Sequence, residues 1–333
     1  MEEVLTKTPL ISIIMPVYNS AEYLKQSVES ILSQSYNKFE FIIIDDGSSD
    51  NTVEIVKSYK DDRIVLYCKP HDGFINQLNF GLQICKGDFI ARMDGDDISH
   101  KERLYTQVNF LLSNEDIALV SSNFYYINEI GKVIQKKKFP EFNDDIEFMM
   151  PVIPSVLHGA MLSRKKPLID IGGYDVNYFC EDVVLFLKML SNGYQMYNLQ
   201  EYLYSYRITE KPYSYHKKHY DDFYKYSREY LDSKYKTNNL KIDDGNYFFR
   251  LGLVEYYNGK PGDSRKYFLK CFQNKKIKKL NLLRYILLSF LGNKIFNFLR
   301  GKGINKRINI FISKYFRLDT NKIINPGKKI NNF

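Results

Sequence analysis

Residues 10–50 read LISIIMPVYNSAEYLKQSVESILSQSYNKFEFIIIDDGSSD, and this stretch decides the fold class. Its two apolar runs, at residues 10–17 and 39–44, have the length and continuous hydrophobicity of strands that are buried on both faces. The residues between them, 21–34, place apolar side chains at helical spacing. Strand, helix and strand in this order form the repeating unit of a parallel sheet with right-handed crossovers.

The alternation of strand and helix continues to about residue 120 and then loosens. Further strands are predicted at 63–68, 88–93, 117–122 and 155–163, a β-rich stretch at 194–207, and helices at 52–59, 76–86, 100–113 and 180–192. From about residue 209 the chain becomes rich in Tyr and Lys and reads as mostly helical. The sequence therefore predicts an α/β domain at 1–208, with a mainly parallel, Rossmann-like sheet flanked by helices, and a helical, strongly basic region at 209–333.

Polar clusters follow three of the first four predicted strands: Tyr18-Asn19, residues 45–47 (DDG) and residues 94–97 (DGDD). In open α/β sheets, ligands bind at the carboxyl ends of the strands, where such loops converge. One Asp-Gly pair alone would more often be turn chemistry, and residues 45–48 alone also fit a turn with a helix cap. Three clusters at neighbouring strand ends favour a ligand site.

The last of these clusters places three carboxylates, Asp94, Asp96 and Asp97, within four residues. Like charges this close are costly unless a positive charge offsets them, and Mg²⁺ favours one or two carboxylates together with substrate phosphates. Gly95 between them would let a diphosphate approach the backbone. No GxGxxG follows the first strand and no GxxxxGK[ST] occurs, which disfavours a dinucleotide-binding fold and a P-loop kinase.

Four blocks of the sequence resemble, in order, the signature blocks of family 2 glycosyltransferases with the GT-A fold. They are residues 11–19 (ISIIMPVYN), 41–50 (FIIIDDGSSD), 86–97 (KGDFIARMDGDD) and 172–182 (GGYDVNYFCED). The resemblance implies an inverting enzyme, of the hexosyl- or N-acetylhexosaminyl-transferase type. It also implies a nucleotide-sugar donor, for which we expect a UDP-sugar, and a divalent metal, Mn²⁺ or Mg²⁺.

On this resemblance, the first three blocks and the segment after the third predicted strand surround the nucleotide and its diphosphate. The donor-binding residues that it implies are Pro16, Val17, Tyr18, Asp46, Gly73, Asn79, Asp94 and Gly95.

The metal and the catalytic base also follow from the resemblance. Asp94 and Asp96 fall on the family's DXD-type motif, and Asp96 is the best single candidate for a metal ligand. Asp182, at the head of a predicted helix, matches the base that activates the acceptor, with Glu181 as the second candidate. Acids in a first helical turn also interact favourably with the helix dipole, so a structural pair is the alternative. His158 lies in a family-like strand, where it would contact the acceptor or be satisfied within the sheet.

The chain departs from the processive members of the family, which resemble one another in a Gln-x-x-Arg-Trp motif and several membrane spans. It has no Trp, and no apolar run reaches the roughly 20 residues that a span needs. We therefore expect transfer of one sugar or of a short, defined number. The acceptor expected from the resemblance is a growing surface glycan, such as a lipid-linked oligosaccharide.

Charge is distributed unevenly along the chain. Residues 272–333 hold 15 Lys or Arg and a single acid, Asp319, whereas the first 271 residues carry a net charge of −5. Basic residues beside an anionic leaflet gain about 1 kcal/mol each, so residues 272–317 are predicted to bind an anionic membrane surface. The alternative is that their leucine stripe packs on the body of the protein.

The N-terminus lacks an apolar signal segment, and the four cysteines form no CxxC pair. A cytoplasmic location, peripheral at the inner face of the cytoplasmic membrane, is therefore expected. Two other functions stay open from the residues alone. One is a nucleotidyltransferase acting on sugar phosphates, although the Gly-rich basic loop typical of that class does not follow the first strand. The other is nucleic-acid binding through the basic tail, which would leave the acidic body without a purpose, so no nucleic-acid partner is expected.

Overall fold

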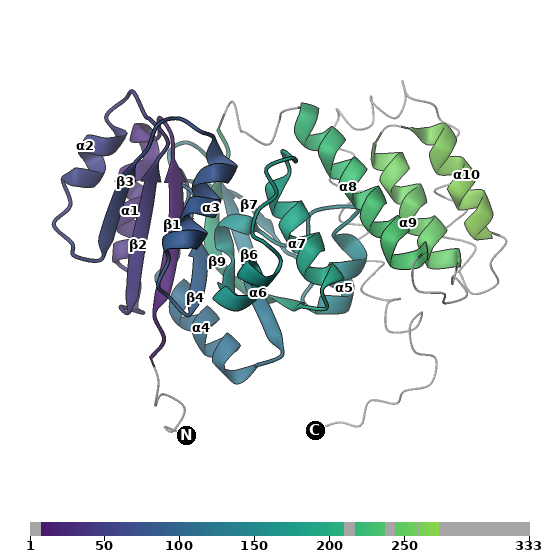
Figure 1. Cartoon of the computed structure of the whole chain (residues 1–333), viewed down its shortest axis with the longest axis horizontal. Helices are drawn as coiled ribbons and strands as arrows, with labels where there is room; N and C mark the ends of the chain where they lie inside the picture. Colours follow the sequence, from purple (N-terminus) through teal and green to yellow (C-terminus); the bar gives the residue numbers. More distant parts are fainter. Residues whose placement is uncertain (1–7, 210–216, 237–243, 259, 273–333) are drawn as a thin grey trace. The chain divides into compact units, whose positions relative to one another are not determined.

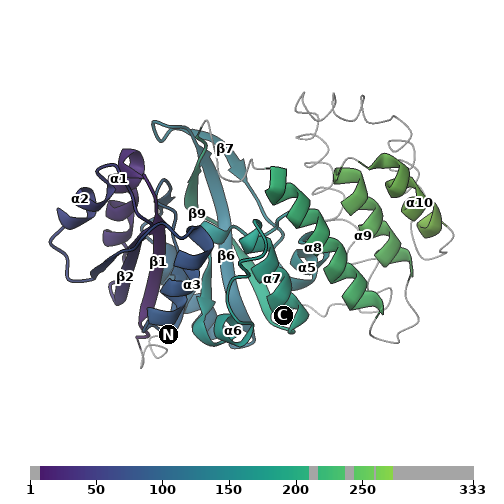
Figure 2. The same cartoon turned by 45° about the horizontal axis from the view of Figure 1, so that its top comes forward.

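The computed structural model describes residues 8–209, 217–236, 244–258 and 260–272 (Figures 1 and 2). They form two compact units. The α/β unit holds the described residues up to His219 except Pro151–Ile153, and the helical unit holds Pro151–Ile153 and the described residues from Tyr220 onward. The predicted α/β class, the helix-flanked sheet and the helical C-terminal region are confirmed. The basic stretch from residue 273, with its predicted membrane contact, lies outside the described residues.

Within the described residues, nine strands form one sheet in the order β3-β2-β1-β4-β8-β6-β9-β5, with β7 paired to β6. The strands are β1 (Ile11–Val17), β2 (Phe39–Asp45), β3 (Ile64–Cys68), β4 (Phe89–Arg92), β5 (Ile98–Ser99), β6 (Ile117–Ile127), β7 (Val133–Lys137), β8 (Leu162–Arg164) and β9 (Gln195–Arg207). The first four are mutually parallel, and β6 is parallel to β9. The loops that follow β1, β2 and β4 therefore meet at one edge of the sheet.

The helices of the α/β unit are α1 (Ala21–Leu32), α2 (Thr52–Lys57), α3 (Phe74–Ile84), α4 (Arg103–Ser113), α5 (Asn143–Met149), α6 (Lys165–Asp170) and α7 (Glu181–Ser191), with the 3₁₀ turn η1 (His158–Ala160). After them come α8 (Lys217–Lys236), α9 (Asp244–Tyr257) and α10 (Pro261–Phe272). None of the helices in the described part of the chain combines the length and the apolar character that crossing a bilayer requires.

Strand β1 is buried along its whole length because helices cover both faces of the sheet. Ile13 packs in one core with Leu24 of α1 and Leu104 of α4. Ile14 points to the opposite face, where α3 approaches so closely that a Cβ at Gly81 would lie 2.6 Å from Ile14 Cγ2. Coverage on both faces explains why the sequence of β1 is continuously apolar rather than alternating.

The prediction for residues 155–163 is wrong in part. Residues 158–160 form the turn η1, and only residues 162–164 form a strand, β8, which is antiparallel to β4 and β6. The sequence SVLHGAMLS reads as a strand, but its centre forms a turn in which Gly159 packs closely against its neighbours. A Cβ there would lie 2.6 Å from both Asp94 Oδ2 and the Tyr204 hydroxyl oxygen.

The helical unit is held together by aromatic and charged contacts between α8, α9 and α10. Glu255 is 2 % exposed, and its Oε1 lies 2.6 Å from Arg228 Nη1. Gly252 lets α10 approach α9, because a Cβ at that position would lie 2.5 Å from the ring of Phe268. Helices α9 and α10 therefore pack against each other as a hairpin.

Candidate active site

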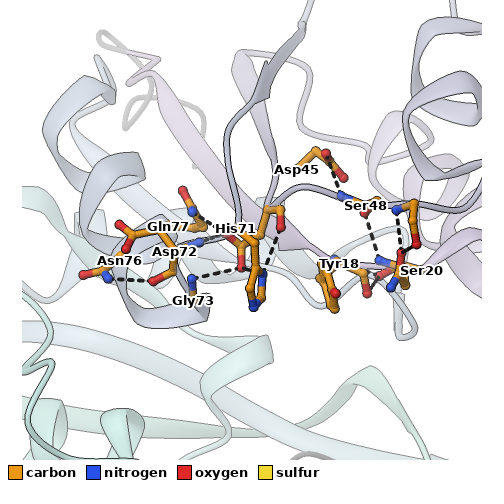
Figure 3. Close-up of polar contacts among 12 residues, drawn as sticks. Tyr18, Ser20, Asp45, Ser48, His71, Asp72, Gly73, Asn76 and Gln77 are labelled. Carbon is orange, nitrogen blue, oxygen red and sulfur yellow. Dashed lines mark hydrogen bonds and ion pairs between the residues drawn. The ribbon is translucent and has the colours of Figure 1, made fainter.

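Two loops interlock at the point where β1 and β2 end (Figure 3). Asn19 takes a left-handed conformation, with φ 48°, and its backbone N–H donates to Ser48 Oγ at 2.9 Å. In return, Ser49 N donates to Asn19 Oδ1 at 2.8 Å. Asp45 Oδ2 accepts from Ser48 N at 3.1 Å, which confirms the turn reading for that carboxylate. These bonds fix the two loops against each other before any ligand binds.

Asp46 is the anchor of the segment that follows β3. Its carboxylate is 3 % exposed and accepts hydrogen bonds from Asp72 N (2.9 Å), Gly73 N (3.1 Å) and the Gln77 side chain. His71 Nδ1 lies 2.9 Å from Asp46 Oδ2. Figure 3 labels the residues that supply these donors, His71, Asp72, Gly73 and Gln77. The structure therefore places Asp46 beneath the 71–73 loop, with its oxygens engaged by protein donors.

Tyr18 and His71 form an exposed aromatic pair at the same edge. Their ring centroids are 4.6 Å apart, with the planes tilted by 31°. Tyr18 is 50 % exposed and the His71 side chain 60 % exposed, whereas the preceding Pro16 and Val17 are buried inside β1. Of the predicted donor residues in this block, only Tyr18 offers a side chain to solvent.

Asp94 lies at the end of β4, above a buried arginine. Arg92 is 2 % exposed and its Nη2 donates to Asp94 Oδ1 at 2.6 Å, while 30 % of the Asp94 side chain stays exposed. The guanidinium Nε and Nη1 of Arg92 have no hydrogen-bond partner. A second buried arginine, Arg103, donates to the carbonyl oxygens of Arg92 (3.1 Å) and Gly159 (2.8 Å). The buried guanidinium groups of Arg92 and Arg103 therefore place positive charge near Asp94.

The next two carboxylates, Asp96 and Asp97, differ in their surroundings. Burial and the charge of Asp94 raise the pKa of Asp96 to about 6. Asp97 is 1 % exposed, its Oδ1 accepts from Arg207 N at 2.7 Å, and burial raises its pKa as well. Arg207 Nε also donates to the carbonyl oxygen of Asp96 at 2.7 Å. Asp97 thus belongs to the scaffold, and Asp94 and Asp96 stay the predicted metal ligands.

Asp94 and Asp96 fit a divalent cation. The pKa of Asp96 is raised partly by Asp94, so the two charges repel each other and a cation would relieve that cost. Within the described ranges, no three His, Cys, Asp or Glu side chains are arranged to hold a metal by themselves. A pair of carboxylates that shares its ion with ligand phosphates is the arrangement that Mg²⁺ favours.

Glu181 and Asp182 open α7, as the sequence predicts. Glu181 is 7 % exposed and its Oε2 has no hydrogen-bond partner. Burial raises its pKa to about 8, and the charges of Asp182 and Asp94 add to the rise. Burial also raises the pKa of Asp182, whose Oδ1 accepts from Val183 N at 2.7 Å. Gly159 abuts Asp94, and the neighbouring His158 lies 3.9 Å from Glu181 Oε1, so the two acidic clusters lie near each other.

His158 packs between these two clusters. It is 7 % exposed, its Nε2 lies 2.7 Å from the Tyr174 hydroxyl, and its Nδ1 lies 3.9 Å from Glu181 Oε1. Burial lowers its pKa well below the usual histidine range, and the charge of Arg92 lowers it further. The geometry favours a satisfied, neutral histidine, and acceptor contact stays a prediction.

The remaining predicted donor residues shape the backbone of the site. Gly73, with φ 92°, precedes α3 and donates its N–H to Asp46. Asn79 exchanges two 2.9 Å hydrogen bonds with the backbone N and O of Tyr174, so it braces the loop before α7. A Cβ added at Gly95 would lie 3.1 Å from Val17 Cγ1. The donor roles of these three residues stay predictions.

Sequence reasoning missed three residues that organise the site: Arg92, Tyr174 and Arg207. Each lies in a stretch that was read only as strand or signature block. A charged residue within the apolar run FIARM was a signal for Arg92, because buried arginines are rare unless paired. The roles of Tyr174 and Arg207 depend on contacts with residues far away in sequence, and the local pattern carries no signal for them.

The raised pKa of Glu181 predicts a pH-dependent stability. Folded Glu181 keeps its proton to about pH 8, whereas an unfolded glutamate loses it near pH ~4.3. Between these values the unfolded state binds fewer protons, so the free energy of unfolding falls as pH rises, by at most about 1.4 kcal/mol per unit. Glu181→Gln should therefore flatten this decline between about pH 6 and 8.

Urea unfolding at several pH values measures this effect. The exposed Glu54→Gln is the matched control and should follow the wild-type curve. Parallel curves for wild type and Glu181→Gln would contradict a protonated Glu181.

Comparison with known proteins identifies the family. The sequence model of "Glycosyl transferase family 2" matches residues 12–172. The chain is 34 % identical over 239 residues to the O-antigen biosynthesis glycosyltransferase WbnJ of Escherichia coli, covering 69 % of this chain and 92 % of that protein. It is 35 % identical over 206 residues to the putative glycosyltransferase EpsE of Bacillus subtilis, covering 60 % of this chain and 73 % of that protein.

Solved structures share the fold at low sequence identity. S. aureus TarS in complex with UDP-GlcNAc superposes with a TM-score of 0.58 at 18 % identity, over 89 % of this chain and 88 % of that one. The mannosyltransferase PcManGT of Pyrobaculum calidifontis, in complex with GDP-Man and Mn²⁺, gives a TM-score of 0.55 at 15 % identity, over 88 % of each chain. Together with the signature blocks and the strand-end site, these relationships establish that the chain belongs to glycosyl transferase family 2 and is a glycosyltransferase with the GT-A fold.

Proposed function

We propose that the protein is an inverting glycosyltransferase that moves one sugar from a nucleotide sugar, a UDP-sugar, to a hydroxyl of a glycan or lipid-linked oligosaccharide in surface polysaccharide synthesis. One observation carries the proposal. Gly159 abuts Asp94, and the neighbouring His158 lies beside Glu181, which supports one site formed by the predicted donor carboxylates and the Glu181-Asp182 pair. The name of WbnJ refers to O-antigen biosynthesis, and the structures of TarS and PcManGT contain nucleotide sugars.

The nucleoside would lie against the edge formed by the loops after β1, β2 and β3. Tyr18 offers an exposed ring on which a base can stack, and His71 extends the same surface. Asp46 contributes by holding the 71–73 loop in place, since its oxygens are occupied by protein donors.

The diphosphate would lie beyond this edge, next to Asp94 and Asp96, which would hold Mn²⁺ or Mg²⁺. When bound, the metal supplies positive charge that stabilises the departing diphosphate. Arg92 holds Asp94 through Nη2 and adds a buried positive charge beneath the site.

Asp182 would accept the proton of the acceptor hydroxyl. As the acceptor oxygen bonds to the anomeric carbon, the bond from that carbon to the diphosphate oxygen breaks, and its electron pair leaves with the nucleoside diphosphate. Attack from the face opposite the leaving group inverts the anomeric configuration. Glu181 does not compete for the proton at neutral pH, because its pKa of about 8 keeps it protonated. Asp182 is therefore the better base.

We further propose that the enzyme works at the cytoplasmic face of the cytoplasmic membrane, where its lipid-linked acceptor would be available. The basic stretch 272–317 would contribute attachment through its charge.

A donor screen with product analysis tests the function. We expect one nucleotide sugar to raise the melting temperature in the presence of Mn²⁺, and turnover with a glycan acceptor to release free nucleoside diphosphate. NMR of the product should show an anomeric configuration opposite to that of the donor. Release of pyrophosphate would instead indicate a nucleotidyltransferase, and retention of configuration would exclude the inverting mechanism.

Tyr18→Ala should weaken donor binding about tenfold, since stacking on one aromatic ring contributes about 1–3 kcal/mol per base. Titration with the nucleoside diphosphate alone, followed by calorimetry, measures this change directly. Tyr105→Ala is the matched control, because Tyr105 is 46 % exposed on α4 and lies outside the predicted site. Unchanged affinity in Tyr18→Ala would remove Tyr18 from the donor site.

A further inference from the structure

Residues 128–138 comprise the turn that follows β6, strand β7 and Lys138, and are here called the lysine hairpin. Its turn is ordered by local bonds: Asn128 N donates to Lys132 O (3.0 Å), and Lys132 N donates to Asn128 Oδ1 (2.8 Å). Gly131 supplies the positive φ, 80°, that the turn requires. The hairpin therefore has a defined shape in the absence of a partner.

The tip of the lysine hairpin exposes large aliphatic side chains. Ile130 is 83 % exposed, Ile134 58 % and Val133 50 %. Ile208 adds to them with 43 %, since its N–H is bonded to Ile127 at the base of the hairpin. Among the described residues, only three other Ile, Leu or Val side chains are comparably exposed, and they lie on other elements. Such a concentration of apolar surface marks an interaction site.

The charge of the lysine hairpin selects an anionic partner. Residues 128–138 contain four lysines and one acid, Glu129. Lys132, Lys136 and Lys138 are exposed, and Lys136 Nζ lies 5.5 Å from the ring centroid of Tyr125. Lysines along an edge strand also disfavour pairing with another strand, so β7 is a poor edge for joining a second sheet. Branched aliphatic side chains offer no hydrogen bonds for reading a sugar.

The hairpin is coupled to the active site through one residue. Arg207 Nη1 donates to the carbonyl oxygens of Asn128 (3.0 Å) and Glu129 (2.7 Å) at the base of the turn. The same guanidinium donates through Nε to the carbonyl oxygen of Asp96. Because Arg207 joins the hairpin to the loop that holds Asp94 and Asp96, a surface that binds the hairpin would lie at a fixed position relative to that loop.

We propose that the lysine hairpin docks on an anionic lipid surface, with Ile130, Val133 and Ile134 inserted between the headgroups and the lysines against the lipid phosphates. The lysine hairpin is distant in sequence from the basic stretch 272–317 and belongs to the α/β unit. It would present the active site to the membrane and so restrict the enzyme to acceptors anchored there.

A single-tryptophan reporter tests the insertion, because the natural chain contains no Trp. The full-length variant Ile130→Trp should show a blue shift of its emission with vesicles of phosphatidylglycerol and phosphatidylcholine, and quenching by brominated lipids. The matched control is Ile169→Trp, because Ile169 is 49 % exposed in the wild type and belongs to α6. Figure 2 shows α6 at the opposite end of the α/β unit from β7. The emission of Ile169→Trp should not change.

The lysines are tested separately by Lys132→Gln/Lys138→Gln, for which we expect about tenfold weaker vesicle partitioning at low salt. The proposal is overturned if the chain sediments with vesicles while Trp at 130 stays unshifted, since other residues would then carry the binding. It is also overturned if nothing sediments, or if the blue shift grows with protein concentration without lipid, which would indicate a second copy. No sugar transfer is measured, so failure here is distinguishable from failure of the proposed function.

Discussion

Asp182→Asn should lower kcat by about 10²–10⁴, the usual effect of losing a general base, while the affinity for the donor stays near that of the wild type. The side chain lies in the first turn of α7, where its Oδ1 accepts a hydrogen bond from the neighbouring Val183 N. Asn preserves this acceptor and the shape of the side chain, so the fold should persist. Single-turnover kinetics at saturating donor and calorimetric donor binding measure the two quantities separately.

The pH profile gives an independent check on the same residue. Burial raises the pKa of Asp182, and the base works only when ionised. Wild-type kcat should therefore fall as pH is lowered through this raised pKa, and Asp182→Asn should lose that limb. Glu181→Gln should reduce kcat less, because Glu181 is already protonated at neutral pH. A larger loss in Glu181→Gln would move the base to Glu181, and small effects in both would favour the helix-dipole reading.

The second large effect is expected at the predicted metal site. Asp96→Asn should reduce metal-dependent turnover by at least about 10²-fold, because the amide oxygen carries no charge to hold a divalent cation or to offset the leaving diphosphate. Asn keeps the size of the side chain, and the backbone oxygen at 96 still accepts from Arg207, so the loop should stay folded. Activity titrated with Mn²⁺ at fixed donor measures the loss.

The exposed Asp62→Asn controls for the change of one charge in the same domain and should titrate like wild type. Near-normal activity of Asp96→Asn in Mn²⁺ would show that the metal lies elsewhere or that none is needed. Without metal, Asp96→Asn should melt no lower than wild type, because the change removes a charge that Asp94 repels, and Asp62→Asn should melt like wild type. These curves separate loss of the ion from loss of the fold.

The sequence predicts the first half of the fold well because its signals are local. The buried strands β1 and β2 are continuously apolar, and the helices between the early strands have clear periodicity. Residues 155–163 also read as a strand, yet residues 158–160 form a turn in which Gly159 packs closely against Asp94 and Tyr204. Strand β5 has only two residues, too few for any pattern to register.

The sequence also predicts only part of the candidate site. Residue types and strand ends were enough to select the clusters that contain Tyr18 and Asp94, whereas Asp182 was selected through the family resemblance. The structure brings the two acidic clusters together. The direction of each carboxylate was beyond the sequence, because it depends on distant donors. Asp46 turns toward the 71–73 loop and Asp97 toward Arg207, so neither offers a free carboxylate.

The contact between Asp97 and Arg207 bears on how the enzyme matures as it is made. The two residues are 110 positions apart, and the later one closes the loop around the first. At about 5–20 residues per second, the ribosome needs roughly 5–20 s to pass from one to the other. Throughout that interval the loop at residues 94–97 lacks the hydrogen bond from Arg207 N of β9. It also lacks the Arg207 guanidinium that joins it to the lysine hairpin. A nascent chain with β1 to β4 already paired would therefore have no competent centre, and catalytic ability would appear in one late step, when β9 joins the sheet.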